Sequence, residues 1–188
     1  MPVYFDPESY AVVAAACERL IPATAGHPGA TGLGVADYVD GLLGAFLVDP
    51  PRVWAGGPFS GRHGGDASFE QFLPLSRLEE LAWRIRIEGS RGIAERELNG
   101  PVPGWQQEYR DGIAALGPDF VGVAPEEQDA RLDAVPGFKQ LLYGHACEGA
   151  YSAPEYGGNR DQAGWDAIGF AGDVQPRGYT DEEVTGRD

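Results

Sequence analysis

The sequence predicts an all-α or mainly α fold in which short helices are joined by long loops rich in glycine and proline. Apolar residues recur at helical steps of three and four in several segments, and few segments alternate apolar and polar residues as strands do. The 28 glycines and 15 prolines separate these segments. The 188 residues suffice for one domain with a sizeable core. We expect this domain at 1–176, followed by a polar acidic tail at 177–188.

The first expected helix begins after Asp6. An aspartate caps the free N–H groups of a first turn, and Pro7 fits the first helical position. Apolar residues then follow at helical spacing from Tyr10 to Ile21, and Pro22 ends the helix. An amphipathic helix therefore opens the fold.

Two loops flank the clearest helical stripe of the chain, which covers 35–47. Turn-forming residues fill 22–32, which we expect to lack regular structure. The glycine-rich stretch 51–66 carries Trp54 and Phe59, and large aromatic residues are rare in flexible linkers. We therefore predict an ordered loop pinned by these two rings.

A third helix is predicted by the capping box Ser76-Arg77-Leu78-Glu79. Its pattern can continue past Gly89 towards Leu98, although glycine is a poor helix former.

Three more helices are expected in the second half of the chain. One covers 105–116, the next starts at Pro125, and the last includes 138–145. The helical pattern stops after Ser152, so the C-terminal region is predicted to be an irregular cap.

The charge balance excludes several classes of function. Lys and Arg number 14 against 29 Asp and Glu, a formal net charge of −15. Nucleic-acid phosphates and anionic lipids both require basic surfaces, so we predict no nucleic-acid partner and no lipid docking. No apolar run reaches the ~18 residues of a membrane span, and the N-terminus lacks a secretory pattern.

The sequence carries no motif for catalysis, cofactor binding or a metal. Nucleophile elbows, dinucleotide fingerprints, phosphate loops and Cys-x-x-Cys pairs are all missing. His27 and His63 lie in loops that are exposed or packed on a partner, whereas His145 lies on an apolar stripe and is expected to be a core histidine. Cys17 and Cys147 are either one disulfide in an oxidising compartment or two buried thiols.

The most informative string is Tyr156-Gly157-Gly158-Asn159, whose glycines permit a tight turn with positive φ. Trp165 follows as an anchor. The string is either a cap over the helical core or a recognition loop that presents backbone donors and Asn159, and the two roles are compatible. Arg160 is expected to pair with an acid of this chain.

The C-terminal sequence resembles the signature of the gluconate 2-dehydrogenase subunit 3 family. The residues that carry this resemblance are Pro-Glu-Tyr-Gly-Gly-Asn-Arg at 154–160, Gly-Trp at 164–165 and Ile-Gly-Phe at 168–170. Glu-Arg-Leu-Ile-Pro-Ala-Thr at 18–24 is similar to the opening of that family.

This resemblance implies a non-catalytic accessory small subunit. Such a subunit binds and stabilises a large oxidoreductase subunit of the glucose-methanol-choline type, assists its export, and often works beside a cytochrome c subunit. FAD and the catalytic histidine belong to the large subunit, so no cofactor is expected in this chain. Many relatives begin with a twin-arginine signal and this chain shows none, which implies a cytoplasmic complex, or a periplasmic one if a signal was removed or the partner supplies it.

The loops and the signature string are the expected binding surface, because aromatic residues are enriched where proteins meet. The predicted partner-binding residues are Tyr156, Gly157, Gly158, Asn159, Trp165, Trp54 and Phe59. The alternative is a stand-alone carbohydrate-active enzyme, a lyase or glycosidase, that uses dispersed carboxylates.

Overall fold

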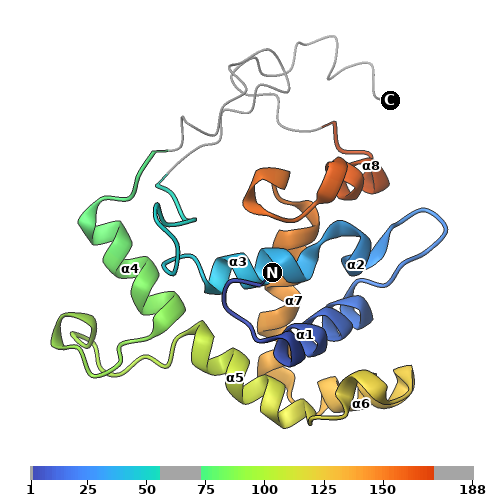
Figure 1. Ribbon diagram of the computed structural model, residues 1–188, viewed down its shortest axis with the longest axis horizontal. Helices are drawn as coiled ribbons and strands as arrows, with labels where there is room; N and C mark the ends of the chain where they lie inside the picture. Colours follow the sequence, from blue (N-terminus) through green and yellow to red (C-terminus); the bar gives the residue numbers. More distant parts are fainter. Residues whose placement is uncertain (1, 56–72, 172–188) are drawn as a thin grey trace.

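The structure, a computed structural model, describes residues 2–55 and 73–171 (Figure 1). Phe59, His63 and the predicted tail at 177–188 lie outside the described residues. Within them the chain forms eight α-helices and no strand, which confirms the mainly α prediction. The helices are α1 Pro7–Leu20, α2 Gly29–Leu33, α3 Val35–Leu43, α4 Arg77–Glu88, α5 Trp105–Leu116, α6 Pro125–Asp133, α7 Pro136–Tyr151 and α8 Ala163–Ile168.

Helix α7 is the centre of the fold. It is 16 residues long and packs against α1, α2, α3, α5, α6 and α8. Helix α4 contacts α5 and α3 and lies to one side of the bundle (Figure 1). The main core is therefore built around one long helix, and α4 packs at its margin.

Local signals explain most helix ends. Asp6 accepts the N–H of Ser9 at 2.8 Å and caps α1, as predicted. Ser76 and Glu79 form the predicted capping box at the start of α4. Helix α5 ends where Gly117 adopts a φ of 91°, a conformation that glycine adopts without strain.

Two predicted helix boundaries were wrong because contacts between distant parts of the chain override the local pattern, and the structure decides a third that the sequence left open. Helix α2 begins inside the expected loop, at Gly29. Helix α3 ends at Leu43 rather than continuing to residue 47, and its cap Gly44 lies against Val3. Helix α4 stops at Glu88, since Gly89 has a φ of 82° and lies against the backbone of Pro103.

The core also contains buried polar groups that are hydrogen-bonded. His145 is buried, and its Nδ1 lies 2.9 Å from the hydroxyl of Tyr109, which confirms it as a core histidine. Burial lowers the pKa of His145 to about 4. The carboxylate of Asp40 accepts the backbone N–H groups of Tyr4 and Phe5 at 3.0 and 2.8 Å, and so holds the N-terminal segment on α3.

Both cysteines are free. Cys17 lies inside the core, where burial raises the pKa of its thiol to about 12, and Cys147 is half-buried. A thiol that stays protonated behaves as a small apolar side chain, so Cys17 contributes to packing.

Candidate partner-binding surface

A cavity of about 580 Å³ opens between α3, the segment 50–54 and the turn that follows α7. We call it the Trp54–Tyr156 groove. Its apolar wall is formed by Tyr38, Leu42, Pro50, Trp54, Trp83 and Tyr156. Pockets that bind other molecules are usually concave and apolar with a few polar groups, so this groove is the candidate site.

The groove brings together two predicted partner-binding residues that are far apart in the sequence. The ring centroids of Trp54 and Tyr156 are 5.7 Å apart, with their planes tilted by 55°. Tyr156 is 36% exposed and Trp54 is half-buried. Large, partly exposed aromatic rings provide contact area with few side-chain torsions to immobilise, which suits a protein–protein contact.

Polar side chains from α3 and α7 line another side of the groove. The hydroxyl of Tyr38 donates to Oε2 of Glu148 at 2.8 Å. Burial, reinforced by the charge of Glu148, raises the pKa of Tyr38, and burial likewise raises the pKa of Tyr156. Both hydroxyls therefore stay protonated at neutral pH and act as hydrogen-bonding groups. The groove carries both signs of charge, because Arg52 lines it together with Glu148 and Glu155.

Asn159 anchors the turn that carries Tyr156. It is fully buried and has a left-handed backbone, with φ 45° and ψ 48°. Its side chain donates from Nδ2 to the carbonyl of Ser152 and accepts at Oδ1 from the N–H of Gly164, each at 2.9 Å. Its own N–H donates to the carbonyl of Gly149 at 2.7 Å. Asn159 thus donates hydrogen bonds to two carbonyl groups at the C-terminal end of α7.

Two glycines let this turn lie directly on α7. A Cβ at Gly158 would lie 2.0 Å from the carbonyl oxygen of Gly149, and a Cβ at Gly164 would lie 2.1 Å from that of Ala150. Real Cβ atoms do not approach oxygen so closely. The glycines of the signature string are therefore explained by backbone packing, and Gly157 by its φ of 105°.

Trp165 completes the cap. It is 4% exposed, and its Nε1–H donates to the carbonyl of Tyr151 at 2.7 Å. The C-terminal region therefore covers the end of α7, as the cap interpretation predicted. It is more regular than predicted, since α8 carries Trp165.

Of the predicted string, Tyr156 and Gly157 are exposed, whereas Gly158, Asn159 and Trp165 are buried. Partner binding by these residues stays a prediction. The three buried residues can contribute to partner binding only indirectly, because they fix the position of the turn that carries Tyr156.

The structure also joins this region to the N-terminal half of the chain. The guanidinium of Arg160 pairs with Asp37, as the sequence predicted for an acid of this chain. Asp37 also accepts the hydroxyl of Tyr10 at 2.5 Å, and burial together with this contact raises the pKa of Tyr10 to about 12. Gly34, with a φ of 70°, leaves the space that Arg160 occupies.

The string at 18–24 has structural roles of its own. Glu18 accepts the N–H groups of Ala23 and Thr31 at 3.0 and 2.8 Å, so it braces the loop and the start of α2. Burial opposes ionisation of Glu18, but these hydrogen bonds outweigh it and lower its pKa. Arg19 binds Asp129 of α6 through two hydrogen bonds of 2.8 and 2.7 Å. Neither residue faces the groove.

His27 closes the same loop. Its Nδ1 accepts the N–H of Gly29 at 3.1 Å, and its Nε2 lies 3.0 Å from the hydroxyl of Tyr151 on α7. Both ring nitrogens therefore have partners inside the chain.

Sequence reasoning missed Tyr38, Trp83 and Glu148 as parts of the groove. Tyr38 lies on a helical stripe that indicates only core, and the other two lie off such stripes. No local signal separates these residues from ordinary helix positions. Their shared surface exists only once α3, α4 and α7 are packed.

The described residues contain no group of three or more His, Cys, Asp or Glu side chains placed to hold a metal ion. Across 2–55 and 73–171, no helix is long and apolar enough to cross a membrane.

Comparison with known proteins identifies the family to which this chain belongs. A family model described as gluconate 2-dehydrogenase subunit 3 matches residues 7–172. The chain belongs to this family. The match spans both signature strings, the buried turn at Asn159 and the Trp54–Tyr156 groove, so these features are parts of a subunit 3 domain. Neither a curated protein nor a solved structure matches the chain.

Proposed function

We propose that this subunit 3 protein is the non-catalytic accessory subunit of an FAD-dependent sugar or polyol oxidoreductase, and that it binds the large flavin-carrying subunit through the Trp54–Tyr156 groove. The observation that carries the proposal is the pairing of these two rings in an open groove of about 580 Å³. Membership of the subunit 3 family supports a role within a multi-subunit dehydrogenase. The accessory subunit would stabilise the large subunit during its assembly and export.

The groove is suited to this role because its base is fixed by hydrogen bonds and its surface combines aromatic and polar groups. Asn159, Gly158 and Trp165 fix the turn on α7 from inside the chain. Tyr156 and Trp54 then present aromatic area together with the polar groups of Tyr38 and Arg52. Aromatic anchors surrounded by a polar rim are where protein interfaces concentrate their binding energy.

The test is co-expression with a large flavoprotein subunit of the glucose-methanol-choline type. We expect a yellow complex that contains both subunits, whereas this chain alone is colourless. Trp54→Ala and Tyr156→Ala should each weaken the complex at least about tenfold, since central aromatic anchors contribute ~2–4 kcal/mol. Affinity is measured by surface plasmon resonance, and circular dichroism shows that each variant is folded.

Leu98→Ala is the matched control. Leu98 is 85% exposed but lies outside the groove, so its truncation should change affinity less than about twofold. Equal affinity of the wild type and both aromatic variants would contradict binding through this groove. Absence of any complex with the flavoprotein would contradict the accessory role itself.

One observation favours the alternative of a stand-alone glycosidase or lyase, namely that Glu148 and Glu155 line the same groove. A pair of carboxylates is the machinery of most glycosidases. Glu148, however, accepts the hydroxyl of Tyr38 at 2.8 Å, as a structural carboxylate does. Turnover of glycosides by the lone chain, abolished by Glu148→Gln or Glu155→Gln, would support the enzyme and overturn the accessory role.

A further inference from the structure

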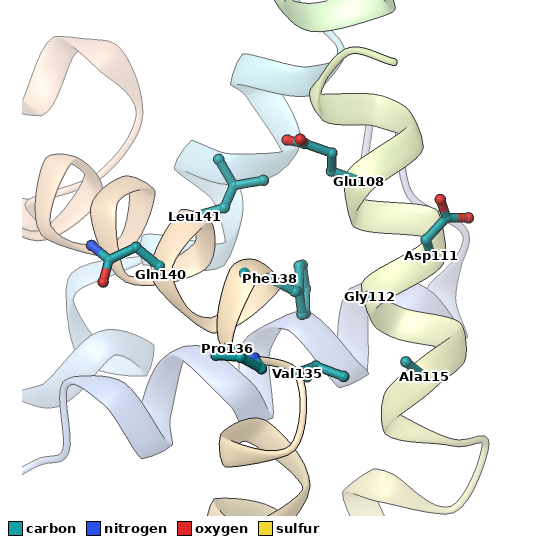
Figure 2. Close-up of a pocket in the computed structure, with 10 residues that line it drawn as sticks. Glu108, Asp111, Gly112, Ala115, Val135, Pro136, Phe138, Gln140 and Leu141 are labelled. Carbon is teal, nitrogen blue, oxygen red and sulfur yellow. The ribbon is translucent and has the colours of Figure 1, made fainter. Parts of the chain in front are cut away.

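A second groove lies between α5 and the first turns of α7, away from Trp54 and Tyr156. Its volume is about 660 Å³. Figure 2 shows its residues on the two facing helices. The floor is apolar and is formed by Gly112, Ala115, Val135, Phe138 and Leu141. We call it the Gly112–Phe138 groove.

The floor of this groove is preformed. The ring of Phe138 packs on the backbone of α5 at Gly112, where an added Cβ would lie 2.2 Å from the ring. The ring also meets Tyr109 of the same helix edge-on, with centroids 5.3 Å apart. Phe138 is therefore packed against two residues of α5. A ligand would meet an apolar surface that needs no rearrangement.

The rim of the groove is acidic. Glu108 and Asp111 lie three residues apart on α5, so they are neighbours on the helix surface, and both line the groove (Figure 2). Both are exposed. Among the described residues that line this groove, none is Lys or Arg.

The basic residues nearest in sequence, Arg110 and Lys139, do not line the groove. Arg110 donates to the hydroxyl of Tyr4 at 3.0 Å and to Gln107 at 2.8 Å. Lys139 pairs with Asp133 at 2.6 Å. Arg110 keeps its charge beside the rim, because both its partners are neutral and one of them, Gln107, also donates to Asp111 at 2.6 Å. The two carboxylates that line the groove, together with the net charge of −15, still leave it with an excess of negative charge.

We propose that the Gly112–Phe138 groove binds a basic segment of the large oxidoreductase subunit. An apolar side chain of that segment lies on the floor, and an adjacent Lys or Arg pairs with Glu108 and Asp111. The stem of such a side chain is itself apolar and can lie along Ala115 or Leu141 while its charged end stays at the rim. The identity of the partner rests on the proposed function.

Charge selects this occupant over others. An acidic segment would be repelled by both carboxylates, and a purely apolar one would leave them without a counter-charge. The Trp54–Tyr156 groove differs, because Arg52 lines it beside its acids. The preference for a basic segment is thus a property of the groove between α5 and α7.

The test compares two charge-reversed variants of the full chain, each co-expressed with the large flavoprotein subunit used above. Glu108→Lys/Asp111→Lys reverses the rim. Glu95→Lys/Glu126→Lys makes the same change of net charge at exposed positions outside the groove. We expect the rim variant to weaken the complex at least about tenfold and the control less than threefold, because charges in contact act more strongly than distant, screened ones.

Two further measurements address the floor and the occupant. Ala115→Trp fills the groove and should also weaken the complex at least about tenfold, with melting temperature as the check on folding. A photo-crosslinking amino acid in place of Gln140, which lines the groove, should capture a flavoprotein segment that contains Lys or Arg beside an apolar residue, as identified by mass spectrometry.

The outcomes separate this inference from the proposed function. A complex that forms with the wild type but is weakened equally by the rim and control variants overturns the groove while the accessory role stands. Crosslinking of position 140 to an acidic segment of the flavoprotein would likewise overturn binding of a basic segment in this groove and leave the accessory role standing. Absence of any complex with the wild-type chain overturns both.

Discussion

The side-chain oxygen of Asn159 accepts the N–H of Gly164 at 2.9 Å, so one buried amide closes the turn that joins the two parts of the C-terminal signature. Its amino group holds the carbonyl of Ser152 at the same time. Burial and full pairing make this amide a structural element. Tyr156, three residues earlier, takes its position in the Trp54–Tyr156 groove from it.

Asn159→Ala removes both side-chain hydrogen bonds and leaves the N–H of Gly164 and the carbonyl of Ser152 without their partner. Since buried groups that lose a partner cost ~1–3 kcal/mol each, the free energy of unfolding should fall by about 2–6 kcal/mol. Urea denaturation measures the loss. Asp161→Asn, at an exposed position of the same turn, should change it by less than ~0.5 kcal/mol.

Gly158→Ala places a methyl group 2.0 Å from the carbonyl oxygen of Gly149. The turn must then move away from α7, and we expect a loss of stability of about 3 kcal/mol or more. Gly144→Ala is the control, because that glycine lies within α7 and a Cβ there would meet nothing within 4 Å. It should gain up to about 1 kcal/mol. Thermal unfolding that ranks the two variants the other way would contradict the packing described here.

The stability of the protein should depend on pH through His145. Burial lowers its pKa from 6.5 to about 4 in the folded chain, so between these values the unfolded chain binds more protons. The stabilisation by neutral His145 is thus complete above pH 6.5 and is lost as the pH falls towards 4, with a full effect of about 3 kcal/mol. Urea unfolding from pH 4 to 7.5 measures it.

His145→Gln is the reference for that experiment, since carboxylates titrate in the same range and contribute to both proteins. The difference in unfolding free energy between wild type and variant should shrink as the pH falls from 6.5 to 4. A difference that stays constant over this range would show that His145 does not carry the effect.

Glu18→Ala removes the acceptor for the N–H groups of Ala23 and Thr31. The loop before α2 then loses its brace, and these amides should exchange with solvent about tenfold faster or more, as expected for a loss of ~1–2 kcal/mol. Hydrogen exchange followed by NMR gives the two rates. In Glu8→Ala, the matched control at an exposed position of α1, both rates should stay as in the wild type.

The sequence was sufficient where a structural signal is local. The cap at Asp6, the capping box at Ser76 and the stop at Gly117 each depend on a few neighbouring residues. Burial of His145 followed from its place on an apolar stripe. The family resemblance depended on two strings whose residues the structure explains by packing and hydrogen bonding.

The sequence did not predict features that depend on contacts between residues far apart in the chain. Glu18 of α1 accepts the N–H of Thr31 in α2, a contact that no local pattern predicts. The contact between the rings of Trp54 and Tyr156 likewise depends on the packing of α3 and α7. In the sequence, nothing distinguishes Glu108 and Asp111 from other surface acids, and only the structure shows that they line the same groove as Phe138. Grooves form only when helices pack against one another, so local sequence patterns do not predict them.

The length of α7 has a consequence for how a bound protein would be released. Gln140 lines one groove and Glu148 the other, and the rise of an α-helix separates them by about 12 Å along a single rod. A large subunit able to reach both would remain tethered by one contact whenever the other opened, so the open contact would re-form at high local concentration. Two modest contacts on one rigid helix would then give a long-lived assembly.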